Sequence, residues 1–274
     1  MRRPGDKNAA PSAVTGHNGS VPADSTLRLL DVEALERSSV VANNAMNRDR
    51  GLSGVNSYAR DLGRDPYEVL TEALRARPDA PVTWIDVCCG SGRALLEAER
   101  RFAHELPDAP VTLIGIDLVG HFRSPPRTPR LRLLTANAER WTPDRPADLV
   151  TCVHGLHYIG DKLALVAAMA DWTAPTGTLL AQFDPHAVRH ADGTSAARRV
   201  LADLRAAGLD YDRRAHRISG RGPRAPRFRA AYLGADDTAG PGYTGQPAVV
   251  SHYVWESARA AGVSSARTGE SPER

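Results

Sequence analysis

The sequence predicts an α/β fold in which a mainly parallel β-sheet is doubly wound, with helices on both faces. Five short runs of aliphatic and β-branched residues alternate with stretches of helical periodicity, and this alternation is the pattern of βαβ units. A glycine-rich turn, Gly90-Ser-Gly92, joins the first run to the next helical stretch. Such a turn lies at the ligand-binding edge of many parallel sheets.

The strands of this sheet are expected at 82–87, 111–117, 131–135, 149–153 and 178–183. Helices are expected at 66–76, 92–105, 161–172 and 195–207. The connection after the second strand contains Pro125, Pro126 and Pro129, which exclude a regular helix longer than one turn. Further strands are expected at 217–220, 227–233 and 248–255, and the last two are predicted to form a closing antiparallel pair.

The composition indicates one large domain. With 274 residues, 42% of them hydrophobic, the chain can bury a substantial core. Both ends are rich in small and polar residues without apolar periodicity, which is typical of disorder. We therefore expect a disordered leader at 1–24, a helical segment at 25–80, the α/β domain at 81–257 and a disordered tail at 258–274.

Several classes of protein are disfavoured by the same data. No apolar run approaches the roughly 18 residues of a membrane span, and no apolar signal core follows the start. Cys88, Cys89 and Cys152 have no spacing typical of a zinc site or a disulfide scaffold, so we expect no metal and a cytoplasmic location. A net charge of only +3 argues against a nucleic-acid partner.

The residues around the glycine turn separate three kinds of nucleotide site. A phosphate-binding NTPase loop requires Lys and Ser or Thr after its last glycine, whereas Arg93 and Ala94 follow Gly92. A dinucleotide fingerprint requires a small residue three positions after Gly92, where this chain has Leu95. Both sites are excluded.

The remaining motif, Asp86-Val-Cys88-Cys-Gly90-Ser-Gly92, resembles the first motif of class I, Rossmann-like, S-adenosylmethionine-dependent methyltransferases, Asp/Glu-x-Gly-x-Gly-x-Gly. Cys88 replaces the first glycine of that pattern. The resemblance covers about residues 60–184 and implies a seven-stranded sheet with an antiparallel last strand. It also implies S-adenosylmethionine as the cofactor, held in part by the turn residues Asp86, Cys88, Gly90 and Gly92.

Two further strand ends match the family. Asp117, followed by Leu118, ends the second strand, where an acid accepts hydrogen bonds from the two ribose hydroxyls in this family. Asn137 and Ala138 follow the third strand, where the family contacts adenine. A simple turn role for Asn137 stays open.

The fourth strand end supplies the candidate catalytic residues. His157 is our first candidate for a general base and His154 our second, because imidazole titrates near neutral pH. His154 is also expected to contact the cofactor, and Tyr158 the acceptor. The alternative is that both histidines only pack beneath the cofactor.

Two other segments are expected to complete the site. Arg50 and Tyr58, just before the fold, are predicted to meet the methionine carboxylate of the cofactor. Asp237, Tyr243 and Gln246 lie in a glycine-rich connection that reaches the strand ends if the closing pair is arranged as in the family. These three are therefore candidate acceptor-binding residues.

The function that this resemblance implies is O- or N-methylation of a small molecule, in specialised metabolism, by a monomer or homodimer. A nucleic-acid methyltransferase is the first alternative, supported by an arginine-rich stretch at 213–229 but not by any Asn/Asp-Pro-Pro motif at the fourth strand. A cofactor-binding cyclase or scaffold that does not methylate is the second, because fold alone does not determine function.

Overall fold

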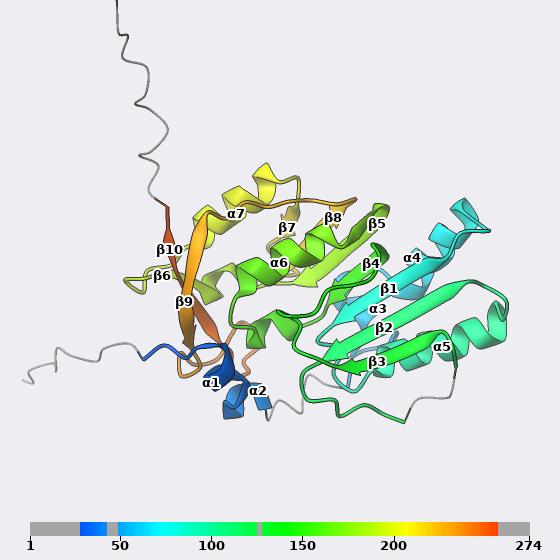
Figure 1. Cartoon of the computed structure of the whole chain (residues 1–274), viewed down its shortest axis with the longest axis horizontal. Coiled ribbons are helices and arrows are strands. Elements are labelled where there is room, and N and C mark those ends of the chain that lie inside the picture. Colours follow the sequence, from blue (N-terminus) through cyan, green and yellow to red (C-terminus); the bar gives the residue numbers. More distant parts are fainter. Residues whose placement is uncertain (1–27, 43–48, 125–127, 257–274) are drawn as a thin grey trace, which may run out of the picture.

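The computed structural model describes residues 28–42, 49–124 and 128–256. Its main sheet has seven strands in the order β3-β2-β1-β4-β5-β8-β7 (Figure 1). The strands from β3 to β5 are parallel, and β8 runs antiparallel to both of its neighbours. The strands are β1 (Val82–Val87), β2 (Val111–Asp117), β3 (Leu131–Thr135), β4 (Ala147–Cys152), β5 (Thr173–Gln182), β7 (Asp210–Asp212) and β8 (Arg217–Arg221). The doubly wound, mainly parallel sheet is thus confirmed, including the bounds of β1, β2 and β3.

Helices cover both faces of this sheet because neighbouring strand residues point to opposite sides. Trp84 packs with the apolar residues of α3, α4 and α5, whereas Ile85 packs with those of α6 and α7. The helices are α3 (Tyr58–Leu62), α4 (Pro66–Ala76), α5 (Arg93–Glu105), α6 (Lys162–Asp171) and α7 (Ala197–Ala206). Each of the four predicted helices is present, with ends shifted by at most two residues. No helix lies in the described parts of the β2–β3 connection, as its prolines predict.

The predicted closing pair forms a second sheet and does not extend the main one. This sheet has the order β6-β10-β9, and β9 pairs antiparallel with β10. Its strands are β6 (Val188–His190), β9 (Ala230–Asp236) and β10 (Val250–Trp255). The pairing is confirmed, but a place in the main sheet is wrong because the short strand β7 occupies the edge beside β8. Tyr253 binds β10 to the start of α6, donating from its hydroxyl to Asp161 Oδ1 at 3.0 Å.

Two short N-terminal helices lie beside β9 (Figure 1). They are α1 (Val32–Glu36) and α2 (Ser39–Ala42). Leu30 and Ala235 exchange two backbone hydrogen bonds of 2.8 and 2.9 Å, which fix this segment against the second sheet. The predicted leader and tail lie outside the described residues. Among the residues that are described, no helix is long and apolar enough to cross a bilayer.

Candidate active site

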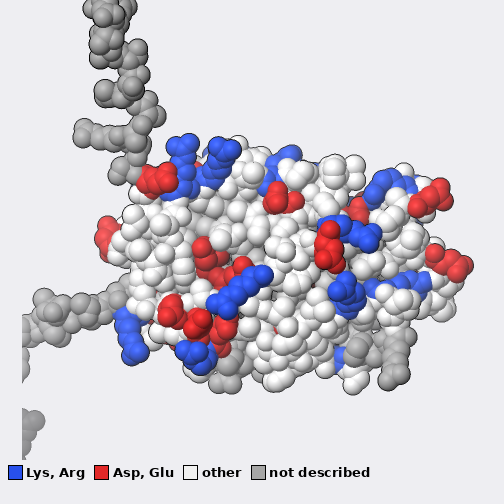
Figure 2. All heavy atoms as spheres, in the orientation of Figure 1, with Lys and Arg blue, Asp and Glu red and all other residues white. Residues whose placement is uncertain are grey.

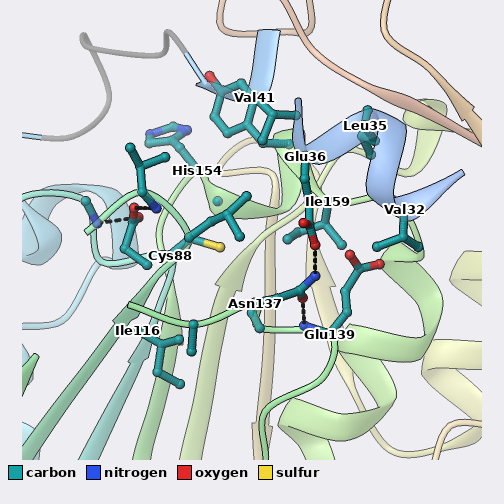
Figure 3. A pocket seen from close by; sticks show the side chains of 18 of the residues that line it. Val32, Leu35, Glu36, Val41, Cys88, Ile116, Asn137, Glu139, His154 and Ile159 are labelled. Atoms are coloured by element: carbon teal, nitrogen blue, oxygen red, sulfur yellow. Dashed lines mark hydrogen bonds between the residues drawn. The ribbon is translucent and has the colours of Figure 1, made fainter. Parts of the chain in front are cut away.

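A pocket lies at the carboxyl ends of β1, β2, β3 and β4, beneath α1 and α2 (Figure 3). Its volume is about 770 Å³, counting the space at its open mouth. Its wall includes these residues predicted to bind cofactor or acceptor: Cys88, Gly90, Asp117, Leu118, Asn137, Ala138, His154 and Tyr158.

The glycine turn borders this pocket with a backbone that other residues rarely adopt. Gly90 has φ 60° and Gly92 has φ 71°, both in the left-handed region. A Cβ atom on Gly92 would lie only 2.9 Å from Leu133 Cδ1. Both the positive φ and the lack of space for a Cβ atom therefore require glycine at position 92. Its small size lets α5 start close to β3.

Asp117 fits the role of a ribose-binding acid. Its Oδ2 accepts a hydrogen bond from Gly90 N at 3.0 Å, and its Oδ1 accepts one from Val119 N at 3.1 Å. A carboxylate has about four acceptor sites, so both oxygens retain capacity for a diol. These two hydrogen bonds also fix the carboxylate at the pocket edge before any ligand binds.

Cys88, the departure from the family motif, occupies a strained position. Its φ is 57°, a left-handed value that glycine adopts freely and other residues at a cost. The extra side-chain atoms fit because residue 155 is glycine. A Cβ atom on Gly155 would lie 2.3 Å from Cys88 Cβ and 2.9 Å from Cys152 Sγ. The chain thus lacks the first motif glycine at the end of β1 and has a glycine, Gly155, just after the neighbouring strand β4.

Both polar atoms of the Asn137 side-chain amide form hydrogen bonds. Its Oδ1 accepts from Glu139 N at 2.7 Å, and its Nδ2 donates to Glu36 Oε1 of α1 (Figure 3). The first bond is the local turn contact that the sequence left open. The second links the floor of the pocket to the helix that covers it. Around this link the wall is apolar, with Val32, Leu35, Ile116 and Ile159, which suits a planar base.

Asp86 and Tyr58 lie beneath the turn and not in the pocket wall. Asp86 is buried and accepts from Tyr58 Oη at 2.8 Å and from Thr151 Oγ1 at 2.6 Å. Burial raises the pKa of the Asp86 carboxyl to about 7, against the lowering effect of these two hydrogen bonds. Both residues therefore support the turn from below. Arg50 forms an ion pair with Asp61 and donates to Asn56 Oδ1 at 2.7 Å.

His154 combines three features of a proton acceptor. It lines the pocket, its Nε2 lies 3.5 Å from Asp61 Oδ2, and its buried Nδ1 has no partner among the described residues. A carboxylate beside Nε2 favours the tautomer protonated there, which leaves a lone pair on Nδ1. Burial lowers the pKa of His154, although Asp61 opposes this shift. The ring is therefore neutral at pH 7.

His157 lies behind His154, with ring centroids 5.9 Å apart and nearly parallel planes. It is only 2% exposed, and its Nε2 has no partner among the described residues. Burial lowers the pKa of His157 to about 3, and the nearby His154 and Lys162 add to this shift. Such a weak base is suited to donating or accepting a hydrogen bond while remaining neutral.

The predicted acceptor residues separate into two groups. Tyr158 lines the pocket, and Tyr243 contacts His157 with ring centroids 4.9 Å apart. Asp237, in contrast, accepts from Ser38 Oγ at the start of α2, outside the pocket wall. Gln246 contributes backbone bonds within its own loop, where its oxygen accepts from Gly242 N at 2.9 Å. Only the two tyrosines are thus placed against the histidines or the pocket.

Sequence reasoning missed three residues at this site. Asp61 lies within the short helix α3 and has no motif around it. Glu36 belongs to α1, and its contact with Asn137 joins residues 101 positions apart. His216 stacks on Tyr243 with ring centroids 3.8 Å apart and an interplanar angle of 5°. These contacts depend on the tertiary fold, and the only available signal was residue type.

The arginine-rich stretch contacts nearby carbonyl groups. Arg217 donates to Leu62 O and lies 3.6 Å from Asp212 Oδ2, and Arg221 Nη2 lies 3.5 Å from Thr176 O. On the face drawn in Figure 2, basic and acidic side chains are interspersed. This face therefore lacks, among the described residues, the extended basic patch typical of nucleic-acid binding.

Comparison with known proteins adds independent information. A family model described as a methyltransferase domain matches residues 58–229. A trans-aconitate 2-methyltransferase of Methylobacterium radiotolerans is 34% identical over 108 residues, which is 38% of each chain. The chain therefore spans well under two thirds of that relative.

Two solved structures are also similar to this chain. One is an amino pentose methyltransferase from Micromonospora echinaspora, involved in calicheamicin biosynthesis and bound to S-adenosylmethionine. It is 28% identical, over 42% of this chain and 48% of that chain, with a TM-score of 0.30. The other is a sugar N-methyltransferase from Streptoalloteichus, 22% identical over 50% of this chain and 60% of that chain, with a TM-score of 0.31.

Proposed function

Because the chain belongs to the class I S-adenosylmethionine-dependent methyltransferases, we propose that it transfers a methyl group to an oxygen or nitrogen of a small-molecule acceptor. One observation carries this proposal. The same pocket is lined by Gly90 of the glycine turn, by Asp117 and by His154, whose Nε2 lies 3.5 Å from Asp61 Oδ2. Three unpaired cysteine thiols support a reducing, cytoplasmic setting. Specialised metabolism is the setting proposed for the acceptor.

The cofactor would be held by contacts that already have fixed geometry. Asp117 would accept from the ribose diol, the apolar wall around Ile116 and Leu35 would cover the base, and the turn at Gly90 and Gly92 would admit the methionine part. Glu36 and Asn137 would close α1 over the adenine end. Arg50, which is paired with Asp61, would bind the methionine carboxylate only by exchanging that partner, and Tyr58 would support Asp86 from beneath.

S-adenosylmethionine supplies a methyl carbon on a positively charged sulfur, which keeps the carbon–sulfur electron pair when the acceptor lone pair attacks. The protein's share is to align the acceptor and remove its proton. We assign the proton to Nδ1 of His154, because Asp61 at Nε2 would stabilise the resulting imidazolium. His157, with a pKa of about 3, would remain neutral and orient the acceptor.

The direct test measures transfer of a labelled methyl group from S-adenosylmethionine to a pool of small metabolites. We expect label in a small molecule, and cofactor binding that Asp117→Ala weakens by about 10- to 100-fold, because one or two hydrogen bonds to a charged group are lost. Asp171→Ala, a change at an exposed Asp at the end of α6, is the matched control and should bind normally.

Other outcomes would select the alternatives. Tight cofactor binding without label transfer would favour the non-methylating scaffold or cyclase. Label in RNA or DNA, with affinity that falls steeply as salt rises, would favour a nucleic-acid methyltransferase. Equal cofactor affinity of Asp117→Ala and Asp171→Ala would contradict the assigned cofactor site.

A further inference from the structure

The ring of Tyr243 lies in an aromatic slot beside the candidate base. It stacks flat on His216, with centroids 3.8 Å apart and an angle of 5°. His157 contacts it from another side at 4.9 Å, and the ring of His154 lies 6.4 Å away. The slot is thus built from two segments distant in sequence, at 154–157 and at 216, and the ring of Tyr243 from a third segment fills it.

The hydroxyl end of Tyr243 lies in a polar environment. Burial raises the pKa of the phenol, and Asp184, Tyr211 and Asp61 raise it further, while Arg50 lowers it. The hydroxyl is therefore within electrostatic range of Asp61, the same carboxylate that pairs with His154. A phenol ring in this position would lie beside His154, whose ring centroid is 6.4 Å from that of Tyr243.

The contacts of the Tyr243 side chain do not fix it permanently in the slot. Among the described residues its hydroxyl forms no hydrogen bond, and ring contacts alone hold it. The backbone bonds within residues 238–248 are internal, including Gly242 N to Gln246 O at 2.9 Å and Ala248 N to Gly240 O at 3.3 Å, whereas Val249 N donates to His157 O at 2.8 Å and fixes the end of the loop. The loop therefore has the means to move as a unit without breaking bonds to the main sheet.

We propose that the acceptor is a phenol or another hydroxylated planar aromatic, and that its ring replaces that of Tyr243 between His157 and His216. This inference rests on the proposed methyl transfer. The loop at 238–248 would move aside as the acceptor enters, while Val249 stays bonded to His157 O. Stacking on an aromatic face contributes about 0.5–1.5 kcal/mol beyond burial, and an aliphatic ring cannot match it.

The chemistry of the slot favours a hydroxyl over a carboxylate. Arg50, the cation within range of this hydroxyl position, is already paired with Asp61. A hydroxyl acceptor needs a base, and the buried Nδ1 of His154 provides one. The phenol oxygen forms a bond to the methyl carbon and the carbon–sulfur bond breaks with its electrons on sulfur. The phenolic proton passes to His154, leaving an aryl methyl ether and S-adenosylhomocysteine.

The test opens the slot with Tyr243→Ala and uses phenol itself as the probe. Calorimetry with and without S-adenosylhomocysteine measures phenol binding, and labelled S-adenosylmethionine measures anisole formation. We expect Tyr243→Ala to bind phenol at least tenfold more tightly than wild type and to form more anisole. Tyr243→Phe is the comparison variant, because it keeps a ring in the slot and should therefore gain no phenol affinity over wild type.

Two further probes define the class of ligand. Cyclohexanol has the same size and hydroxyl but is not planar, and benzoate is planar but carries a carboxylate. Equal or tighter binding of either one to Tyr243→Ala would overturn the proposal, as would weaker phenol binding than in wild type. Phenol binding without anisole formation would support the aromatic slot but contradict the proposed methyl transfer. Failure of the slot proposal and failure of the proposed function therefore give different results.

Discussion

The strained backbone at Cys88 gives a stability prediction with an internal control. A left-handed conformation costs a residue other than glycine about 1–2 kcal/mol, and Cys88 has φ 57°. Cys88→Ala keeps this strain and removes only the thiol. Cys88→Gly removes both, but increases the entropy of the unfolded chain by about 0.5–1 kcal/mol. Cys88→Gly should therefore be more stable than Cys88→Ala by roughly 0.5–1 kcal/mol.

The adjacent Cys89 provides the control because it does not share the positive φ. It is also buried, at 6% exposure. There glycine should be less stable than alanine, by about 0.5–1 kcal/mol. Urea unfolding of the four variants, followed by tryptophan fluorescence, measures both differences. If alanine is the more stable residue at both positions, the strain argument is refuted.

Two other predictions concern acid stability and the covering helices. Burial lowers the pKa of His157 to about 3 from the 6.5 of an exposed histidine, so the unfolded state binds more protons between these values. Above pH 6.5 the burial of neutral His157 therefore does not reduce the free energy of unfolding. As pH falls from 6.5 toward 3, protonation of this histidine in the unfolded state reduces that free energy progressively. Wild type should lose up to about 1.4 kcal/mol per pH unit more than His157→Gln below pH 6, and parallel urea midpoints of the two proteins would contradict this. Ser38→Ala removes the hydrogen bond from α2 to Asp237 and should speed dissociation of S-adenosylhomocysteine about three- to tenfold in stopped-flow measurements. An unchanged rate would show that this bond does not hold the covering helices closed.

The strands that the sequence predicted best are those with complete local signals. β1, β2 and β3 are short apolar runs ended by turn residues, and their observed bounds match the prediction. β5 begins at Thr173, earlier than expected, because the strand accommodates Pro175 at an exposed position, next to an irregularity in its pairing with β4. β6 and β7 have only three residues each; β6 is a strand because it pairs with the distant β10, and β7 because it pairs with the next strand, β8.

The site residues also divide into those that have a local sequence motif and those that do not. Gly90 and Asp117 follow a motif of fixed spacing at strand ends, and both line the same pocket. Tyr58 was assigned to the cofactor by its position before the fold, but its hydroxyl binds Asp86 below the turn. Asp61 had no motif, although it connects to His154.

Backbone strain explains why the histidine cluster was the hardest part to foresee. Four non-glycine residues among those described have positive φ, and three of them, Cys88, His154 and His216, lie at the pocket or the aromatic slot. Each such conformation costs on the order of 1–3 kcal/mol and persists only where the surrounding packing imposes it. The residue type alone does not predict that a histidine will adopt a left-handed backbone conformation. The cost is incurred during folding, so the imidazoles at 154 and 216 are already oriented when a ligand arrives, and binding energy need not be spent on positioning them.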